Sequence, residues 1–82
     1  MNDQDLLNRI TATSGVLTGK PVVRGTRLSV EFILGLLAHG SSNAEIIDEY
    51  NGLQEEDIQA CILFAANSLS NMSFMPLSAE SV

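Results

Sequence analysis

The sequence predicts a single, mainly α-helical domain with a short β segment near its N-terminus. Apolar residues dominate two stretches that follow helix-start signals, and these predict helices. β-branched residues are dense between positions 10 and 30, which predicts strands. A chain of 82 residues is near the lower size limit for a self-sufficient core. The expected parts are an extended or β-hairpin segment, a three-helix core and a flexible tail, at residues 1–29, 30–69 and 70–82.

The N-terminal segment is interrupted by turn residues at Thr18-Gly19-Lys20-Pro21. Short strands are expected on either side of this turn, and one hairpin is the simplest arrangement. Two strands alone are marginally stable in water. The segment is therefore expected to pack against other elements.

The first core helix is expected at residues 30–39. Ser29 is a suitable N-cap, Glu31 is favourable in the first turn, and Gly40 provides a C-terminal stop. His39, the single histidine, lies beside that stop, where its ring can contact terminal carbonyl groups. We interpret His39 in this way rather than as a catalytic or metal-binding residue.

The second and third core helices are joined by a short turn. Ser42 and Glu45 match the capping box, which predicts a helix over residues 43–50. After the turn at 51–53, a helix is expected over residues 55–69, with acidic residues in its first turn. Two helices separated by a short turn that contains Gly predict helix-turn-helix geometry.

The first and third core helices are apolar around most of their circumference. Such helices are normally buried on all sides, and three short helices cannot bury both of them within one chain. A homodimer is therefore expected, and the alternative is a monomer with a partly exposed apolar face. The expected dimer interface contains Phe32, Leu36, Ile62, Leu63 and Phe64.

The charge distribution is uneven. The net charge is −6, all four Lys and Arg residues lie between Arg9 and Arg27, and eight of the ten acidic residues follow position 27. This balance is unlike that of the usual basic DNA-binding protein. The acidic N-terminus is unlike a signal peptide, and no apolar run is long enough to span a membrane. Together with a single cysteine, Cys61, these features predict a cytoplasmic protein.

The search for catalytic or metal-binding chemistry gives little. Cys61 lies in the most apolar stretch and is interpreted as a core residue. Gly15, Gly19 and Lys20 superficially resemble a phosphate-binding loop, but the spacing is one residue short and Pro21 stands where Ser or Thr is required. The carboxylates of the second and third core helices are interpreted as solvated side chains rather than cation ligands. We therefore expect no enzyme activity, no cofactor and no metal.

The basic segment at Lys20, Arg24 and Arg27 is the candidate contact region. If DNA binds, these residues of both subunits must bind it, because the last core helix begins with three consecutive carboxylates. Alternatively, Arg24 and Arg27 are structural and pair with acidic helices of the same or a neighbouring subunit. In a third interpretation, the two arginines are presented to an external anion or an acidic cleft.

The run Gly19-Lys20-Pro21-Val22-Val23-Arg24-Gly25-Thr26-Arg27, with Glu45-Ile46, Tyr50, Leu53 and Glu56-Asp57-Ile58 after it, resembles the domain of unknown function 433 family over about residues 10–67. The resemblance implies a homeodomain-like, usually dimeric core. It also implies, for part of the family, an antitoxin that neutralises a PIN-like ribonuclease. Gln54 stands where the family commonly has a Thr cap, which predicts a weaker start of the last helix.

These observations lead to an antitoxin-like protein-interaction module as the first hypothesis. Its expected contacts are Lys20, Arg24, Thr26 and Arg27, with a partner-binding tail at Phe74, Met75 and Leu77. The second hypothesis is a DNA-binding regulator that uses the paired basic segments of a dimer. The third is an interaction protein in which the basic residues only hold the dimer together.

Overall fold

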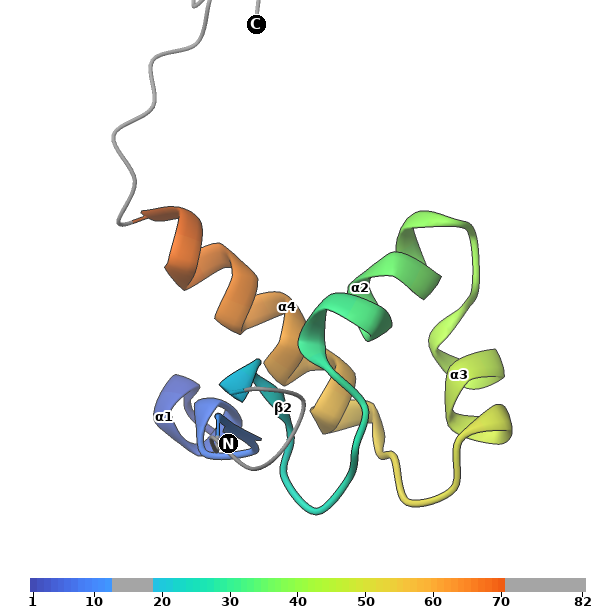
Figure 1. Ribbon diagram of the computed structural model, residues 1–82, viewed down its shortest axis with the longest axis horizontal. Helices are drawn as coiled ribbons and strands as arrows, with labels where there is room; N and C mark the ends of the chain where they lie inside the picture. Colours follow the sequence, from blue (N-terminus) through green and yellow to red (C-terminus); the bar gives the residue numbers. More distant parts are fainter. Residues whose placement is uncertain (13–18, 71–82) are drawn as a thin grey trace, which may run out of the picture.

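The computed structural model describes residues 1–12 and 19–70, which contain four helices and a two-stranded antiparallel sheet (Figure 1). The mainly helical class and the short β segment are as predicted. In chain order the elements are α1 (Asp3–Leu7), β1 (Ile10–Thr11), β2 (Val22–Val23), α2 (Val30–Ala38), α3 (Asn43–Glu49) and α4 (Glu55–Ser70).

Helix α1 corrects the prediction of an extended N-terminus. The Asn2 side chain accepts a hydrogen bond from the backbone N–H of Asp5 at 2.8 Å, and the Asp5 carboxylate accepts from the Asn2 N–H at 3.2 Å. This reciprocal pair is a capping box that lies outside the stretches with helical periodicity. Five residues cannot form a stable helix alone, and α1 packs against α4.

The sheet joins the N-terminal arm to the segment that precedes α2. Ile10 pairs with Val23 and Thr11 with Val22, so the predicted short strands are present and paired. Ile10, Val22 and Val23 are buried, which explains why β-branched residues stand there.

Helix α2 begins and ends at the predicted signals. The Ser29 hydroxyl accepts from the Phe32 N–H at 2.9 Å. At the other end, Gly40 has φ of +101°, and the N–H groups of Gly40 and Ser41 donate to the carbonyls of Leu37 and Leu36. This is the Schellman motif, which favours glycine because its residue has positive φ. The His39 Nδ1 atom lies 2.7 Å from the Gly35 carbonyl, in agreement with its expected role at the helix end.

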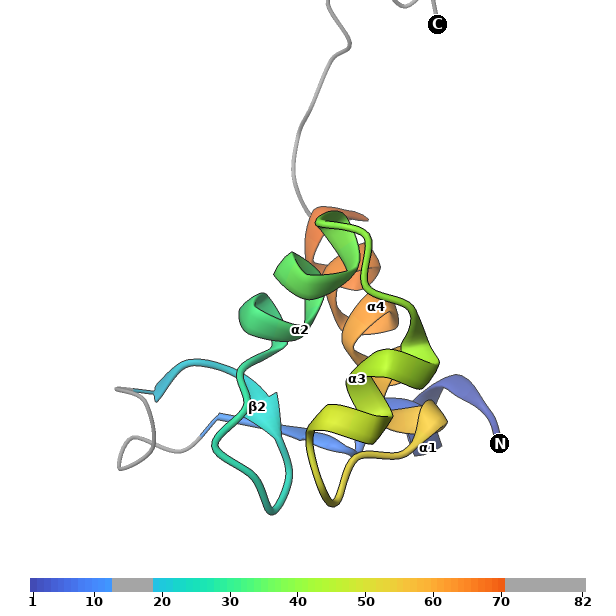
Figure 2. The ribbon, with the colours of Figure 1, turned by 90° about the vertical axis from the view of Figure 1, so that its right-hand side faces the viewer.

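Helix α4 is the element around which the others are arranged. It packs against α1 and β1 on one side and against α2 and α3 on the other (Figures 1 and 2). The capping box predicted at Ser42 and Glu45 starts α3 and positions it for this contact. Ile33, Ile46, Ile58 and Cys61 are among the most deeply buried side chains and form the centre of the core.

The second half of α4 is more exposed than the first. Ile62 is 49% exposed and Leu69 is 65% exposed, and on α2 the Phe32 side chain is 42% exposed. No helix in residues 1–12 and 19–70 combines the length and the apolar character needed to cross a membrane. The predicted tail residues Phe74, Met75 and Leu77 lie outside the described residues.

Candidate functional site

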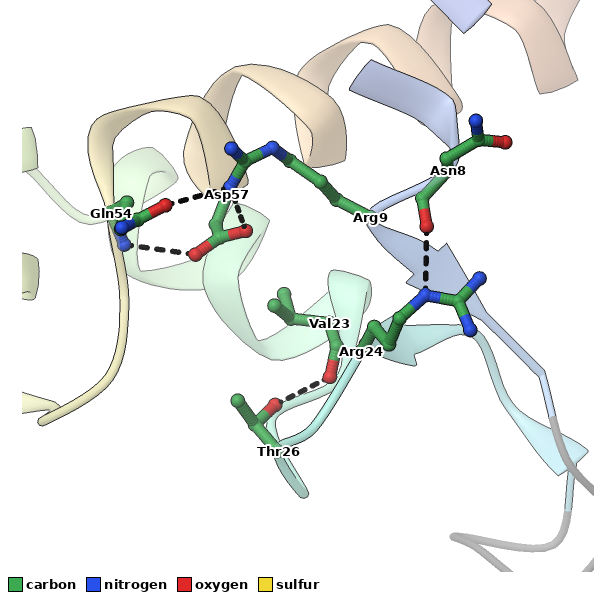
Figure 3. A network of polar contacts seen from close by, with 7 residues as sticks. All are labelled: Asn8, Arg9, Val23, Arg24, Thr26, Gln54 and Asp57. Carbon is green, nitrogen blue, oxygen red and sulfur yellow. Dashed lines mark hydrogen bonds and ion pairs between the residues drawn. The ribbon is translucent and has the colours of Figure 1, made fainter. Parts of the chain in front are cut away.

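A partly buried ion pair joins the N-terminal arm to the start of α4 (Figure 3). The Arg9 Nη1 atom donates to Asp57 Oδ1 at 2.9 Å and to Gln54 Oε1 at 3.0 Å. The Asp57 side chain is 9% exposed and that of Arg9 is 26% exposed, so the carboxylate is well shielded from water. A shielded carboxylate requires a partner of opposite charge, and Arg9 provides it.

Asp57 also caps α4. Its second oxygen, Oδ2, accepts a hydrogen bond from the Gln54 backbone N–H at 2.9 Å. The sequence predicts a weaker helix start because Gln54 is a poor cap, but the cap contact comes from Asp57 instead. The Gln54 side chain accepts from Arg9. One carboxylate therefore satisfies both the helix terminus and the arginine of the distant arm.

Cys61 lies one helical turn beyond Asp57 and is fully buried, as predicted for a core residue. Burial raises the pKa of its thiol from an ordinary value of 9.0 to about 11, and the Asp57 carboxylate contributes in the same direction. The thiol is therefore neutral at physiological pH and unsuited to nucleophilic chemistry.

Residues 21–30 form a tight hairpin that projects a turn from the sheet. The Val23 N–H donates to the Leu28 carbonyl at 2.9 Å, and the Thr26 N–H donates to the Val23 carbonyl at 3.0 Å. Gly25, the third residue of this turn, has φ of +81°, the conformation that a type II turn requires at that position.

The Thr26 hydroxyl holds the turn closed. It donates to the Val23 carbonyl at 2.8 Å and accepts from the Leu28 N–H at 3.0 Å. The sequence predicts Thr26 as a partner contact, but its side chain is half-buried and bonded within the turn. Its role in the structure is to fix the backbone that carries the arginines on either side.

Arg24 and Arg27 are both exposed on this turn. The Arg24 Nε–H donates to the Asn8 carbonyl at 2.9 Å, and its backbone N–H donates to the Arg9 carbonyl at 2.7 Å. Within residues 1–12 and 19–70, neither Arg24 nor Arg27 contacts a carboxylate. Among the described residues, the ion pair with an acidic helix of the same chain, one of the two pairings in the structural hypothesis for Arg24 and Arg27, is formed by Arg9.

The predicted basic segment divides between two cavities. Lys20 forms an exposed ion pair with Glu31 at 3.1 Å and lines a cavity of about 590 Å³ over α2, with Phe32, Leu36 and His39. Arg24 lines a different cavity of about 410 Å³. The second cavity is polar and is lined by Asn8, Arg9, Arg24, Gly52, Gln54 and Asp57.

Sequence reasoning missed Asn8, Arg9, Gln54 and Asp57 as members of this site. Arg9 directly precedes the β-branched stretch, and a charge at the edge of a buried strand is a signal that could have identified it. Asp57 was interpreted as a solvated dipole partner, because helix periodicity does not show which residue of the first turn faces the core. In the described part of the chain, no three His, Cys, Asp or Glu residues form a group that could hold a metal ion.

Comparisons with known proteins identify the relatives of this chain. The family described as a protein of unknown function, DUF433, matches residues 10–65. The chain is similar to a DUF433 member protein from Anabaena variabilis, whose crystal structure matches it with a TM-score of 0.72 and 30% sequence identity. The match covers 82% of this chain and 66% of that one. The chain thus spans slightly less than two thirds of the length of that protein. No curated protein matches the chain.

Proposed function

The chain belongs to the DUF433 family of proteins of unknown function, and we propose that it is a non-enzymatic, cytoplasmic protein-interaction module of the antitoxin type. Its proposed partner is a PIN-like ribonuclease, which holds its metal with a cluster of carboxylates. In this proposal Arg24 or Arg27 enters the acidic cleft and competes with the metal for the carboxylates.

The observation that supports this proposal is the exposure of two arginines on one rigid turn of an acidic protein. The net charge is −6, yet Arg24 and Arg27 are both exposed on a turn that the Thr26 hydroxyl holds closed. Positive charge that is isolated in this way is complementary to an acidic surface of another protein. Arg9 and Lys20 already have carboxylate partners within the chain. The two arginines of the turn are therefore the residues proposed to contact an external carboxylate.

DNA is the second candidate partner, and the charges around the turn disfavour it. Glu55, Glu56 and Asp57 stand at the start of α4, the helix that would enter the major groove if α3 and α4 acted as a helix-turn-helix. A reader of DNA gains its affinity from Lys and Arg on phosphate. We therefore propose that the α3–α4 pair serves packing rather than base recognition.

A homodimer is part of the same proposal. Phe32 and Ile62 are exposed, and Leu36, Leu63 and Phe64 are only partly buried. Apolar side chains on α2 and α4 that stay accessible to water favour a second copy as their cover.

Light scattering of the full chain is expected to give twice the monomer mass, and the variant Ile62→Glu is expected to give the monomer mass. Ala44→Glu, on the exposed face of α3, is the matched control and should stay dimeric.

The partner is tested with a PIN-like ribonuclease. We expect the two proteins to co-purify and the nuclease to lose its activity on RNA. The double variant Arg24→Ala/Arg27→Ala should restore RNA cleavage because the turn then lacks positive charge. Lys20→Ala is the control, since it removes one charge at the other cavity. A double variant that inhibits as well as the wild type would contradict the proposal.

A further inference from the structure

The Arg24 side chain is anchored at one edge of its guanidinium. The Nε–H donates to the Asn8 carbonyl, while the four N–H groups on the two Nη atoms have no partner within the described residues. In Figure 3 both Nη atoms lie on the side of Nε that faces away from Asp57. The guanidinium is therefore held by its inner edge and offers its outer end to solvent.

The anchor itself is held firmly. Asn8 is the C-cap of α1, and its N–H donates to the Gln4 carbonyl at 2.9 Å. The next residue, Arg9, is fixed by Asp57 and Gln54, and Ile10 is buried in the sheet opposite Val23. The Asn8 carbonyl thus lies between a helix end and a partly buried ion pair, and it orients Arg24 without contacting a partner.

We propose that Arg24 is a pre-oriented receptor for a single carboxylate of an acidic protein surface, approached end-on by its two Nη atoms, and that the Asn8 carbonyl is its positioning group. This deepens the proposed function and rests on it for the identity of the partner. A guanidinium whose Nε is occupied can still form two parallel hydrogen bonds to the two oxygens of a carboxylate. A lysine ammonium cannot reproduce that geometry.

Carboxylate is favoured over phosphate by the charges near the turn. Arg24 lines a cavity with Gln54 and Asp57 at the start of α4, and Glu55 and Glu56 stand between those two residues in the chain, so an extended run of phosphates bound here would add its charge to that of these carboxylates. A protein can present one carboxylate and keep the rest of its charge at a distance. The receptor is therefore suited to an Asp or Glu side chain of a folded partner.

The orientation is tested first without any partner. Nitrogen-15 NMR of the full chain gives the solvent exchange rate of each arginine Nε–H. We expect the Arg24 Nε–H to exchange about tenfold more slowly than that of Arg27, because within residues 1–12 and 19–70 the Arg24 Nε–H is hydrogen-bonded and that of Arg27 is not. Equal exchange rates would overturn the positioning role of Asn8 and would leave the antitoxin proposal intact.

Carboxylate recognition is tested with a glutamate hexapeptide, inorganic phosphate and a short DNA duplex, each titrated at low ionic strength. The hexapeptide should shift the Arg24 resonances in a saturable way. Arg24→Lys should weaken its binding about tenfold, as much as Arg24→Ala does, whereas Arg27→Lys should change it by about twofold. Thermal melts check that each variant is folded.

The outcomes separate the two ideas. Full binding by Arg24→Lys, or tighter binding of phosphate or DNA than of the hexapeptide, would overturn the receptor. If the receptor behaves as expected but no nuclease co-purifies, the antitoxin function falls and the carboxylate receptor stands.

Discussion

Arg9 and Arg24 are neighbours across the sheet, yet their environments differ. Arg9 directly precedes Ile10 and Arg24 directly follows Val23, the residue paired with Ile10, and the Arg24 N–H donates to the Arg9 carbonyl. Arg9 is directed inward to a buried carboxylate, whereas Arg24 bonds a backbone carbonyl and keeps its outer end exposed. Like charges directly opposite each other destabilise a strand pair. Asp57 neutralises the charge of Arg9, which reduces the repulsion between Arg9 and Arg24.

One arginine is paired within the fold, whereas the other keeps the outer end of its guanidinium exposed, and we propose that this second arginine serves recognition. Removing the partner of Arg9 should destabilise the protein strongly, and removing the Arg24 side chain should leave its stability nearly unchanged.

Asp57→Ala is expected to have the largest effect. It removes a helix cap and leaves Arg9 partly buried without a counter-charge. We expect a loss of about 3 kcal/mol in the free energy of unfolding, measured by chemical denaturation. The control is Glu56→Ala in the same helix turn, which should cost about 0.5 kcal/mol. Similar losses for the two variants would show that Arg9 is not held by Asp57.

A pH above 9 should lower the free energy of unfolding through the buried thiol of Cys61. The pKa of Cys61 is raised from 9.0 to about 11 in the folded protein. Above pH 9 the unfolded chain therefore loses this proton first, and the free energy of unfolding falls until about pH 11. The expected loss is on the order of 2 kcal/mol. Cys61→Ala should remove this part of the pH dependence, and a persistent fall of the same size would contradict the assignment.

Gly25→Ala tests the rigidity of the turn. The added methyl group meets no atom within 4 Å, so the effect comes from the backbone, whose φ of +81° is unfavourable for alanine. We expect a loss of about 1 kcal/mol in the free energy of unfolding and weaker partner binding. Gly35→Ala is the matched control: it also meets no atom within 4 Å but lies in α2. It should raise stability by about 0.5 kcal/mol.

Arg24→Ala and Arg27→Ala should have the smallest effect on stability. Both side chains are exposed, and the hydrogen bond from Arg24 to the Asn8 carbonyl is at the surface. The free energy of unfolding should change by less than about 0.5 kcal/mol for each variant. A larger loss would favour the hypothesis that these arginines are structural.

Local signals in the sequence were sufficient to place most elements. Ser29, Ser42 with Glu45, and Gly40 mark the ends of α2 and the start of α3 at the observed positions. These signals are hydrogen bonds between residues close in the chain, so the sequence displays them directly. Helix α1 was missed because five residues show no period, although Asn2 and Asp5 carry the same kind of capping signal.

The candidate site was only partly predictable, for a different reason. Arg24 and Arg27 stand out by charge alone, and the structure places both on the surface. The Arg9–Asp57 pair joins residues 48 positions apart, and no local pattern indicates which carboxylate of α4 faces the core. The roles of Lys20 and Thr26 depend likewise on Glu31 and on the turn, which only the folded chain brings into contact.

The anchoring of Arg24 on a main-chain carbonyl also has a consequence for sequence divergence. Arg9 and Asp57 contact each other through their side chains, so substitution at one position should be accompanied by substitution at the other among related proteins. Position 8 contributes its carbonyl whatever its side chain, so Asn8 is free to vary while the orientation of Arg24 is preserved. Covariation should therefore reveal the Arg9–Asp57 ion pair and overlook the contact that orients Arg24, the residue that we propose for binding.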